Sequence, residues 1–500
     1  MRQLSVFLSI TAVALAQQAA PDARFRVDTE LIQVNVIAQN ADGKPVADLK
    51  REEFRIFDRG VAQEIRLFEA ESEATVPRPT GAKASQVFTN QPPLSTGSRS
   101  GYAVILLDTL HTNFGDPRKP EEGSGAAIHK TLELLRSISP SDKIAIYALQ
   151  RKLEVICEFT SDRILLEQRL RAWKIPIDMP VKTSEAMAEA FAPAKEMREA
   201  ARIDALGRIS ASDGELLQVA DHLAGIPGRK NLIWIADVFP VSGPALQKLR
   251  EAGVAIYPVD AFGVCPQLVA DSPGEFAPCP PRPVDAMNAI AAFTGGLAYY
   301  YRNDLDVAMR EALDDGRVSY TLGYYRFAKD SAAGPPQVTV QVSRRGVVLR
   351  SQTIRQPGPL PVSRDPKVDA IRTMNQPVDA TAIPIALRIT PAGDSLDMYA
   401  LLDLSSLDLV LDHGVWSGKL KLLTRFTDAE GRAVGEASDQ TLTLSLRPAT
   451  YEKAAQLGFP YDLKLKTPAK ASELKLLFMN PATGKTGTVT VSLSDVKGHS

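Results

Sequence analysis

Six consecutive apolar residues from Tyr102 to Leu107 precede an acidic residue, Asp108. An apolar run without alternation is typical of a strand that is buried on both faces of a sheet. A polar loop with a hydroxyl group at Thr112 follows the strand. Ligands of α/β sheets bind beyond the carboxyl ends of the strands, so the pattern indicates a functional crevice here. A carboxylate and a hydroxyl group in that place could hold a hard divalent cation through oxygen ligands.

Strand and helix patterns alternate from residue 101 onward. Two further apolar strands, at 231–236 and 254–259, are followed directly by Asp237 and Asp260. We expect strands at 101–108, 143–149, 153–159, 231–236, 254–259, 297–301 and 319–326, and helices at 127–138, after 160–162, and at 183–206, 213–223, 243–252, 285–294 and 304–314. This alternation predicts an α/β fold with a doubly wound, mostly parallel sheet of the Rossmann-like type.

The rest of the chain has strand patterns. Alternation with a period of two over 25–38, with short apolar runs at 54–57 and 63–68, predicts a small β domain. The strands expected near the C-terminus, at 383–390, 396–404, 417–427, 440–447, 461–466, 474–479 and 487–494, have the spacing of a β-sandwich. We therefore divide the chain into a leader at 1–16, a small β domain at 24–70, a linker at 71–100, an α/β domain at 101–355, a Pro-rich linker at 356–375 and a β-sandwich domain at 376–500.

The first sixteen residues have the pattern of a secretory signal peptide. A basic start at Arg2 precedes an apolar stretch from Leu4 to Leu15, and the segment 14–16 is a small-x-small cleavage site. No later apolar run approaches the roughly 20 residues that a membrane span needs. We expect an exported protein without a membrane span, located in the periplasm, in the cell envelope or outside the cell.

Charge and cysteine content narrow the classes of function. The 58 basic and 59 acidic residues nearly cancel, and no basic block suggests a nucleic-acid binder. Cys157 lies in an expected strand and is interpreted as a buried apolar residue. Cys265 and Cys279 flank a Pro-rich loop and either form a disulfide or stay reduced. Without ligand-type spacing, three cysteines do not indicate a zinc site. Nothing here defines the oligomeric state.

Several short motifs occur in a characteristic order between residues 54 and 324. They are 54–60 (FRIFDRG), 107–112 (LDTLHT), 142–146 (DKIAI), 159–162 (FTSD), 228–235 (GRKNLIWI), 256–260 (IYPVD), 294–296 (TGG) and 320–324 (YTLGY). In this order they resemble the von Willebrand factor A-related proteins, an extracytoplasmic bacterial group abundant in Acidobacteria. The resemblance covers about 24–355 and implies a von Willebrand A-like α/β domain behind a signal peptide.

The resemblance also implies a metal site. Such domains hold a cation with an Asp-x-Ser-x-Ser loop, a threonine from a second loop and a later aspartate, and a carboxylate of the partner completes the shell. Carried over here, Asp108 matches the first aspartate, Thr112 the second hydroxyl position and Asp237 the late aspartate. Leu110 replaces the first serine, so one oxygen ligand is lost. Thr183 is a candidate for the mid-chain threonine. The resemblance therefore implies a degenerate adhesion site that binds Mg²⁺ weakly.

Other interpretations of these residues stay open. Asp108 equally fits a role as a cap that accepts backbone N–H groups of its own loop, and His111 is interpreted as a polar surface group. Asp260 is interpreted as a turn residue. The three strand-end aspartates could also form a carboxylate cluster with Mg²⁺ in a hydrolase. Against an enzyme, the chain has neither a Gly-x-Ser-x-Gly nor a His-Glu-x-x-His motif.

The sequence thus leaves three functions open. The first, implied by the resemblance, is a secreted or envelope-associated protein of the adhesion type that binds a protein partner through the partner's carboxylate. The second is the Mg²⁺-dependent hydrolase. The third is a purely structural component of the envelope.

Overall fold

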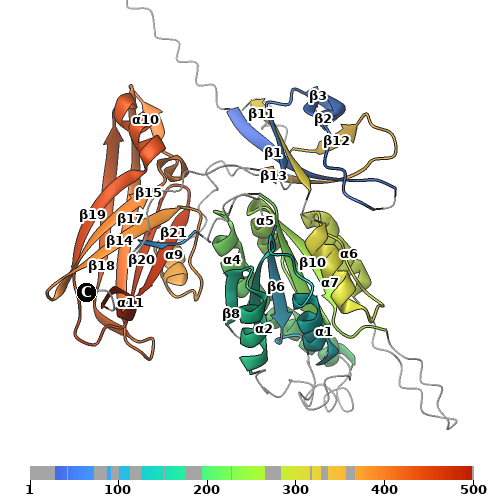
Figure 1. Cartoon of the computed structure of the whole chain (residues 1–500), viewed down its shortest axis with the longest axis horizontal. Coiled ribbons are helices and arrows are strands. Elements are labelled where there is room, and N and C mark those ends of the chain that lie inside the picture. Colours follow the sequence, from blue (N-terminus) through green and yellow to red (C-terminus); the bar gives the residue numbers. More distant parts are fainter. Residues whose placement is uncertain are drawn as a thin grey trace, which may run out of the picture.

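The structure, a computed structural model, describes residues 29–41, 43–71, 87–91, 101–112, 125–150, 152–174, 194–226, 228–264, 283–315, 318–327, 336–355 and 366–497. The expected signal peptide at 1–16, Thr183, Cys265 and Cys279 lie outside the described residues. An α/β unit, a region built around the N-terminal strands and a C-terminal region of strands are seen in Figure 1. None of the helices in the described ranges is long and apolar enough to cross a bilayer.

A five-stranded sheet forms the centre of the α/β unit, with the strand order β10-β9-β6-β7-β8. Its strands are β6 (Tyr102–Asp108), β7 (Lys143–Leu149), β8 (Leu153–Thr160), β9 (Lys230–Ala236) and β10 (Val254–Asp260). Helices α1 (Gly125–Leu135), α2 (Arg163–Ala172) and α7 (Leu305–Asp314) pack on one face, and α4 (Ala194–Leu223), α5 (Gly243–Glu251) and α6 (Val284–Thr294) pack on the other. Every residue of β6, β9 and β10 is buried, which accounts for their unbroken apolar sequences.

The expected doubly wound, mostly parallel, Rossmann-like fold is wrong for this chain. Within the described ranges only the sheet of the α/β unit has parallel pairs, and it is mixed because β8 runs antiparallel to β7. The four other sheets are antiparallel throughout. The connection at 150–152 explains the reversal, because a parallel return needs a crossover of a dozen residues or more.

The N-terminal region combines strands from both ends of the α/β unit. One sheet has the order β13-β1-β11-β4 and the other the order β12-β2-β3. The elements are β1 (Thr29–Gln39), η1 (Arg51–Glu53), β2 (Phe54–Asp58), β3 (Val61–Gln63), β4 (Leu67–Glu71), β11 (Ser319–Phe327), β12 (Val338–Val342) and β13 (Val348–Arg355). Val34 of β1 lies between Leu322 of β11 and Thr353 of β13. The strands at 319–355, expected within the α/β domain, therefore pair with the N-terminal strands instead.

The C-terminal region packs two antiparallel sheets around one apolar core. The first sheet has the order β19-β15-β14-β5, and the second has the order β16-β17-β20-β21 with β18 paired to β17. The strands are β5 (Val87–Thr89), β14 (Ile385–Ala392), β15 (Ser395–Leu402), β16 (Val410–Asp412), β17 (Val415–Thr427), β18 (Ala433–Leu446), β19 (Phe459–Lys466), β20 (Glu473–Met479) and β21 (Thr486–Ser492). The helices are α9 (Pro366–Met374), η2 (Leu404–Leu407), α10 (Pro448–Leu457) and α11 (Leu493–Lys497). Strand β5 comes from the expected linker at 71–100, so part of that segment is built into this region.

Two polar joints connect the α/β unit to its neighbours. At the first, Asp315 forms an ion pair with Arg350 of β13. At the second, Thr381 of the C-terminal region lies against the end of α4. Its Oγ1 donates a hydrogen bond to the carbonyl of His222 and accepts one from the N–H of Gly225, both 2.7 Å long. A Cβ atom on Gly225 would overlap the carbonyl oxygen of Thr381, so this close approach requires glycine.

Candidate functional site

The candidate site lies at the carboxyl ends of β6 and β9. The two strands are parallel neighbours, with Leu107 opposite Ile235, so Asp108 and Asp237 leave the sheet at the same edge. Thr112 Oγ1 accepts a hydrogen bond from the backbone N–H of Asp237, with a length of 2.8 Å. The structure therefore brings Asp108, Thr112 and Asp237 to one edge, which we call the strand-end edge.

The carboxylate of Asp108 accepts hydrogen bonds from four donors. Oδ1 accepts from the backbone N–H groups of Leu110 and His111, at 3.1 and 3.0 Å. Trp234 Nε1 donates to Oδ2 at 3.0 Å. His111 Nδ1 lies 3.0 Å from Oδ1 and 2.9 Å from Oδ2, and it must be the donor because a carboxylate accepts. Four donors match the roughly four acceptor positions of a carboxylate, so its capacity is used internally.

Burial and neighbouring contacts close this cluster further. The side chains of Asp108 and His111 both have 0% exposure. His111 Nε2 lies 3.5 Å from Oγ of Ser212, on α4. A buried imidazole thus sits between the Asp108 carboxylate and a helix on the other side of the edge. The interpretation of His111 as a polar surface group is wrong, because its ring is held by the strand-end carboxylate.

These contacts do not fit a resident Mg²⁺ ion. Magnesium needs oxygen ligands with open lone pairs and usually keeps several of its waters. The acceptor positions of Asp108 are filled by donors of this chain. Within the part of the chain that the structure describes, no group of three or more His, Cys, Asp or Glu side chains is placed to hold a metal ion.

Asp260, the third strand-end acid, lies apart from Asp108 in the sheet. The order β10-β9-β6 puts one whole strand between them. Asp260 Oδ1 accepts a hydrogen bond from the N–H of Phe262 at 3.2 Å, which is the contact of a turn residue. Asp260 is buried at the end of β10.

Three members of the site could not be assigned from the sequence pattern. Ser212 lies 101 positions after His111 on a helix, and nothing local marks it. Trp234 stands in the middle of an apolar run and reads as core. A signal was available for it, since a buried indole N–H needs an acceptor and the neighbouring strand ends in an acid. For His111 the spacing Asp-x-x-His was the only clue.

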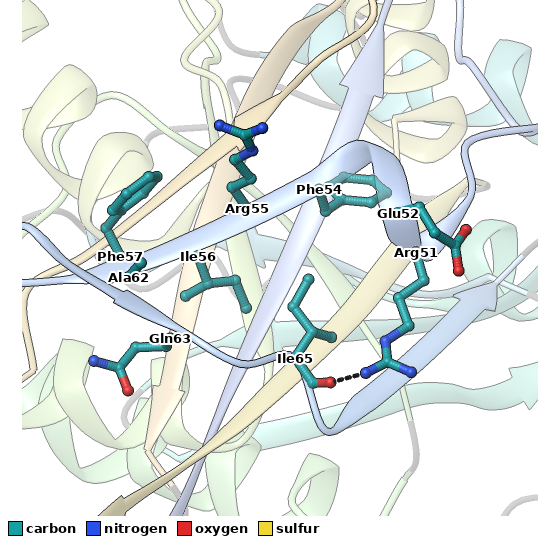
Figure 2. Close-up of a pocket in the computed structure, with 9 residues that line it drawn as sticks. All are labelled: Arg51, Glu52, Phe54, Arg55, Ile56, Phe57, Ala62, Gln63 and Ile65. Carbon is teal, nitrogen blue, oxygen red and sulfur yellow. Dashed lines mark hydrogen bonds between the residues drawn. The ribbon is translucent and has the colours of Figure 1, made fainter.

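A pocket of about 540 Å³ lies in the N-terminal region, in a different sheet from the strand-end edge (Figure 2). Phe54, Ile56 and Ile65 form its apolar part, and all three are buried. The guanidinium of Arg51 donates a hydrogen bond to the carbonyl of Ile65 across the pocket (Figure 2). Its lining contains no histidine, serine or cysteine. Its one carboxylate, Glu52, is exposed, whereas the strand-end edge holds a buried carboxylate in contact with a buried imidazole, so the strand-end edge is the stronger candidate.

Comparisons with known proteins add little to this geometry. No family model matches the sequence, and no curated protein matches it. An aerotolerance-related membrane protein from Bacteroides fragilis NCTC 9343 is 14% identical over 43% of this chain and 99% of its own, with a TM-score of 0.29. A von Willebrand factor type A protein from Catenulispora acidiphila is 10% identical over 86% of this chain and 72% of its own, with a TM-score of 0.26.

A manganese-loaded TRAP protein from Plasmodium vivax is 8% identical over 77% of this chain and 98% of its own, with a TM-score of 0.26. The structural neighbours include a protein described as von Willebrand factor type A, which is the family that the sequence motifs resemble. TM-scores this low establish neither a common fold nor a common function.

Proposed function

We propose that this chain is an exported protein-binding protein of the adhesion type, which recognises a protein partner at the strand-end edge of its α/β unit. The observation that carries the proposal is the 2.8 Å hydrogen bond from the N–H of Asp237 to Thr112 Oγ1. It ties the loops after β6 and β9 into one rim, on which Asp237 is partly exposed. A rim held by internal bonds loses little conformational freedom on binding, which favours recognition.

The same geometry argues against the hydrolase alternative. A general base or nucleophile has to come within hydrogen-bond reach of the substrate. Asp108 and the His111 ring are fully enclosed, and Ser212 is also fully buried. Metal-assisted hydrolysis needs carboxylates with open coordination positions, and Asp108 has none. The proposal of export rests on the pattern of residues 1–16.

Site-specific photo-crosslinking tests the proposal. A photo-reactive amino acid is placed at position 237 of the full chain, expressed with its own leader, and the cells are illuminated. The matched control carries the same amino acid in place of Ile164, which is 62% exposed on α2 of the same unit. We expect a discrete crosslinked protein with position 237 and none with position 164. The same products from both positions would favour a structural envelope component, and no product from either would contradict the proposal.

A further inference from the structure

The contacts of His111 place its imidazole against the strand-end acid on one side and against a helix hydroxyl on the other. Nδ1 lies within 3.0 Å of both oxygens of Asp108, and Nε2 lies 3.5 Å from Ser212 Oγ. A ring nitrogen at these distances from both oxygens stands where an ion chelated by that carboxylate would have to stand. A cation bound to both oxygens of Asp108 would occupy the same space as His111 Nδ1, so the ring and the cation cannot be present together.

We propose that the His111 imidazole occupies the place of a cation at the strand-end edge, so that the site is closed to divalent metals. The consequence for recognition, that a partner binds without a metal, rests on the proposed function. The closure itself does not, since it concerns only the side chains of this chain and can be measured with metal alone.

Three further features of the edge agree with closure. Leu110 has no side-chain oxygen, and its N–H is shared between Asp108 Oδ1 and the carbonyl of Leu149. Trp234 covers the other carboxylate oxygen with an indole N–H from β9. A cation entering this position would have to displace both the indole and the imidazole, and both side chains are buried. Displacing a well-packed internal donor without giving it a new acceptor leaves a buried N–H group unsatisfied, which opposes entry of the cation.

Oxygen atoms at the strand-end edge indicate what removal of the ring would leave. Besides Asp108, the hydroxyl groups of Thr112 and Ser212 lie on the contacts described above, and Asp237 is joined to Thr112 through its backbone. Carboxylate and hydroxyl oxygens are the ligands that Mg²⁺ and Mn²⁺ prefer. The Asp108 carboxylate is thus an oxygen ligand whose position for a chelated cation is filled by a side chain. Shortening that side chain, and restoring a hydroxyl at position 110, should open it.

Titration calorimetry with MnCl₂ on the full chain tests this directly. We expect no saturable binding by the native chain and saturable binding by the Leu110→Ser/His111→Ser double variant. Adding Asp108→Asn to the double variant should abolish the binding. The control is His129→Ser, which removes an exposed histidine of α1 and should behave as the native chain does. Saturable binding by the native chain that is lost in Asp108→Asn would overturn the proposal. Absence of binding by a double variant that melts cooperatively would overturn it equally.

A second measurement needs no variant and stands if the double variant does not fold. A ligand that binds only the folded state raises its melting temperature, and a chelator removes that gain. We expect the melting temperature of the native chain to be the same in EDTA and in MnCl₂. A fall in EDTA that MnCl₂ reverses would refute closure by His111. Neither metal experiment depends on crosslinking at position 237, so failure of closure and failure of partner binding are distinguished.

Discussion

Two buried histidines of this chain contact carboxylates, and their surroundings differ in kind. His111 and Asp108 belong to one unit, and the carboxylate is surrounded by donors from that unit alone. His222 lies at the joint between the α/β unit and the C-terminal region. Its Nδ1 donates to the backbone carbonyl of Asp379 at 2.7 Å, and its Nε2 lies 3.6 Å from Oε2 of Glu158. The first pair fills one carboxylate with donors, whereas the second places one imidazole between two acceptors.

The second arrangement links docking of the two regions to a proton. An imidazole that donates from Nδ1 has a donor at Nε2 only when it is protonated, and the Nε2 of His222 faces a carboxylate. Burial alone would lower the pKa of His222, but Glu158 and the Asp379 carbonyl outweigh it and raise the pKa. Partial burial would raise the pKa of Glu158, but His222 and the hydroxyl of Tyr147 outweigh it and lower the pKa. The comparison shows two uses of a buried histidine. A carboxylate whose acceptor positions are filled holds its loop in one conformation, whereas an imidazole between two acceptors makes a contact that depends on pH.

Removing the Asp108 carboxylate should have the largest effect. In Asp108→Ala the His111 ring, the His111 backbone N–H and the Trp234 indole N–H lose this acceptor, which we expect to cost about 4 kcal/mol. Hydrogen exchange measured along the chain should show faster exchange in β6 and β9 and unchanged exchange in β15 and β20. Asp397→Asn, on the half-exposed side of β15, is the control and should change stability by less than about 0.5 kcal/mol. An equal loss of protection in all regions would mean that the contacts of Asp108 stabilise the whole chain and not the α/β unit alone.

Gly225→Ala should disrupt the joint near His222, which is the second site compared above. The new methyl group overlaps the Thr381 carbonyl and forces the joint apart, at a cost of about 3 kcal/mol. Faster exchange is expected at 376–383 and at the end of α4, with β6 unchanged. Gly214→Ala, within α4, is the control, because a Cβ there meets open space. That change should stabilise the helix by about 1 kcal/mol. An intact joint in Gly225→Ala would show that the close approach is not needed for docking.

These two sites also mark how far sequence reasoning reaches. The apolar runs of β6, β9 and β10 are local signals, and the rule on strand ends led from them to Asp108 and Asp237. The start of α2 after 160–162 was equally local, since Asp162 accepts hydrogen bonds from the N–H groups of Ile164 and Leu165. Cys157 is buried in β8, as its strand position predicted.

What the sequence could not supply is which distant segments meet. The sequence of β11 fits an α/β sheet or an antiparallel one equally well, and its pairing with β1 joins segments almost 300 residues apart. The strand β5 escaped notice because three residues in a polar segment carry no period. Ser212 and Thr381 reach their partners across more than a hundred positions, as packing of whole elements dictates. Local pattern predicts elements, and non-local packing decides sheets and sites.

The pH dependence of the joint should be the next largest effect. A raised pKa of His222 stabilises the docked state below the ordinary value of 6.5, and this gain is lost as pH rises through the raised value. A lowered pKa of Glu158, caused by His222 and Tyr147 of the same unit, stabilises the folded α/β unit above the ordinary value of 4.5, and this gain is lost as pH falls through the lowered value. The contacts of His222 with Glu158 and with the Asp379 carbonyl should therefore be strongest between about pH 4.5 and 6.5.

Exchange at 376–383, corrected for the intrinsic effect of pH, measures this window. We expect protection to decline above the window by an amount on the order of 1 kcal/mol. His222→Gln, which keeps a donor for the Asp379 carbonyl without titrating, should remove the dependence on the neutral side. A native chain whose protection is level from pH 5 to 9 would contradict the link between the proton and the joint.

The last prediction is that a serine-reactive probe does not label the protein. This result would show that the contact between His111 and Asp108 is not part of a reactive site. Ser212 contacts His111, and His111 contacts Asp108, which is the same chain of contacts as that of the nucleophile, base and acid in serine hydrolases. Order alone does not make an enzyme, because the nucleophile must meet a substrate, and Ser212 is fully buried. A fluorophosphonate probe should therefore leave the native chain unlabelled, as it leaves Ser212→Ala. Stoichiometric labelling that Ser212→Ala abolishes would reverse the comparison, since the His111 pair would then be the reactive one.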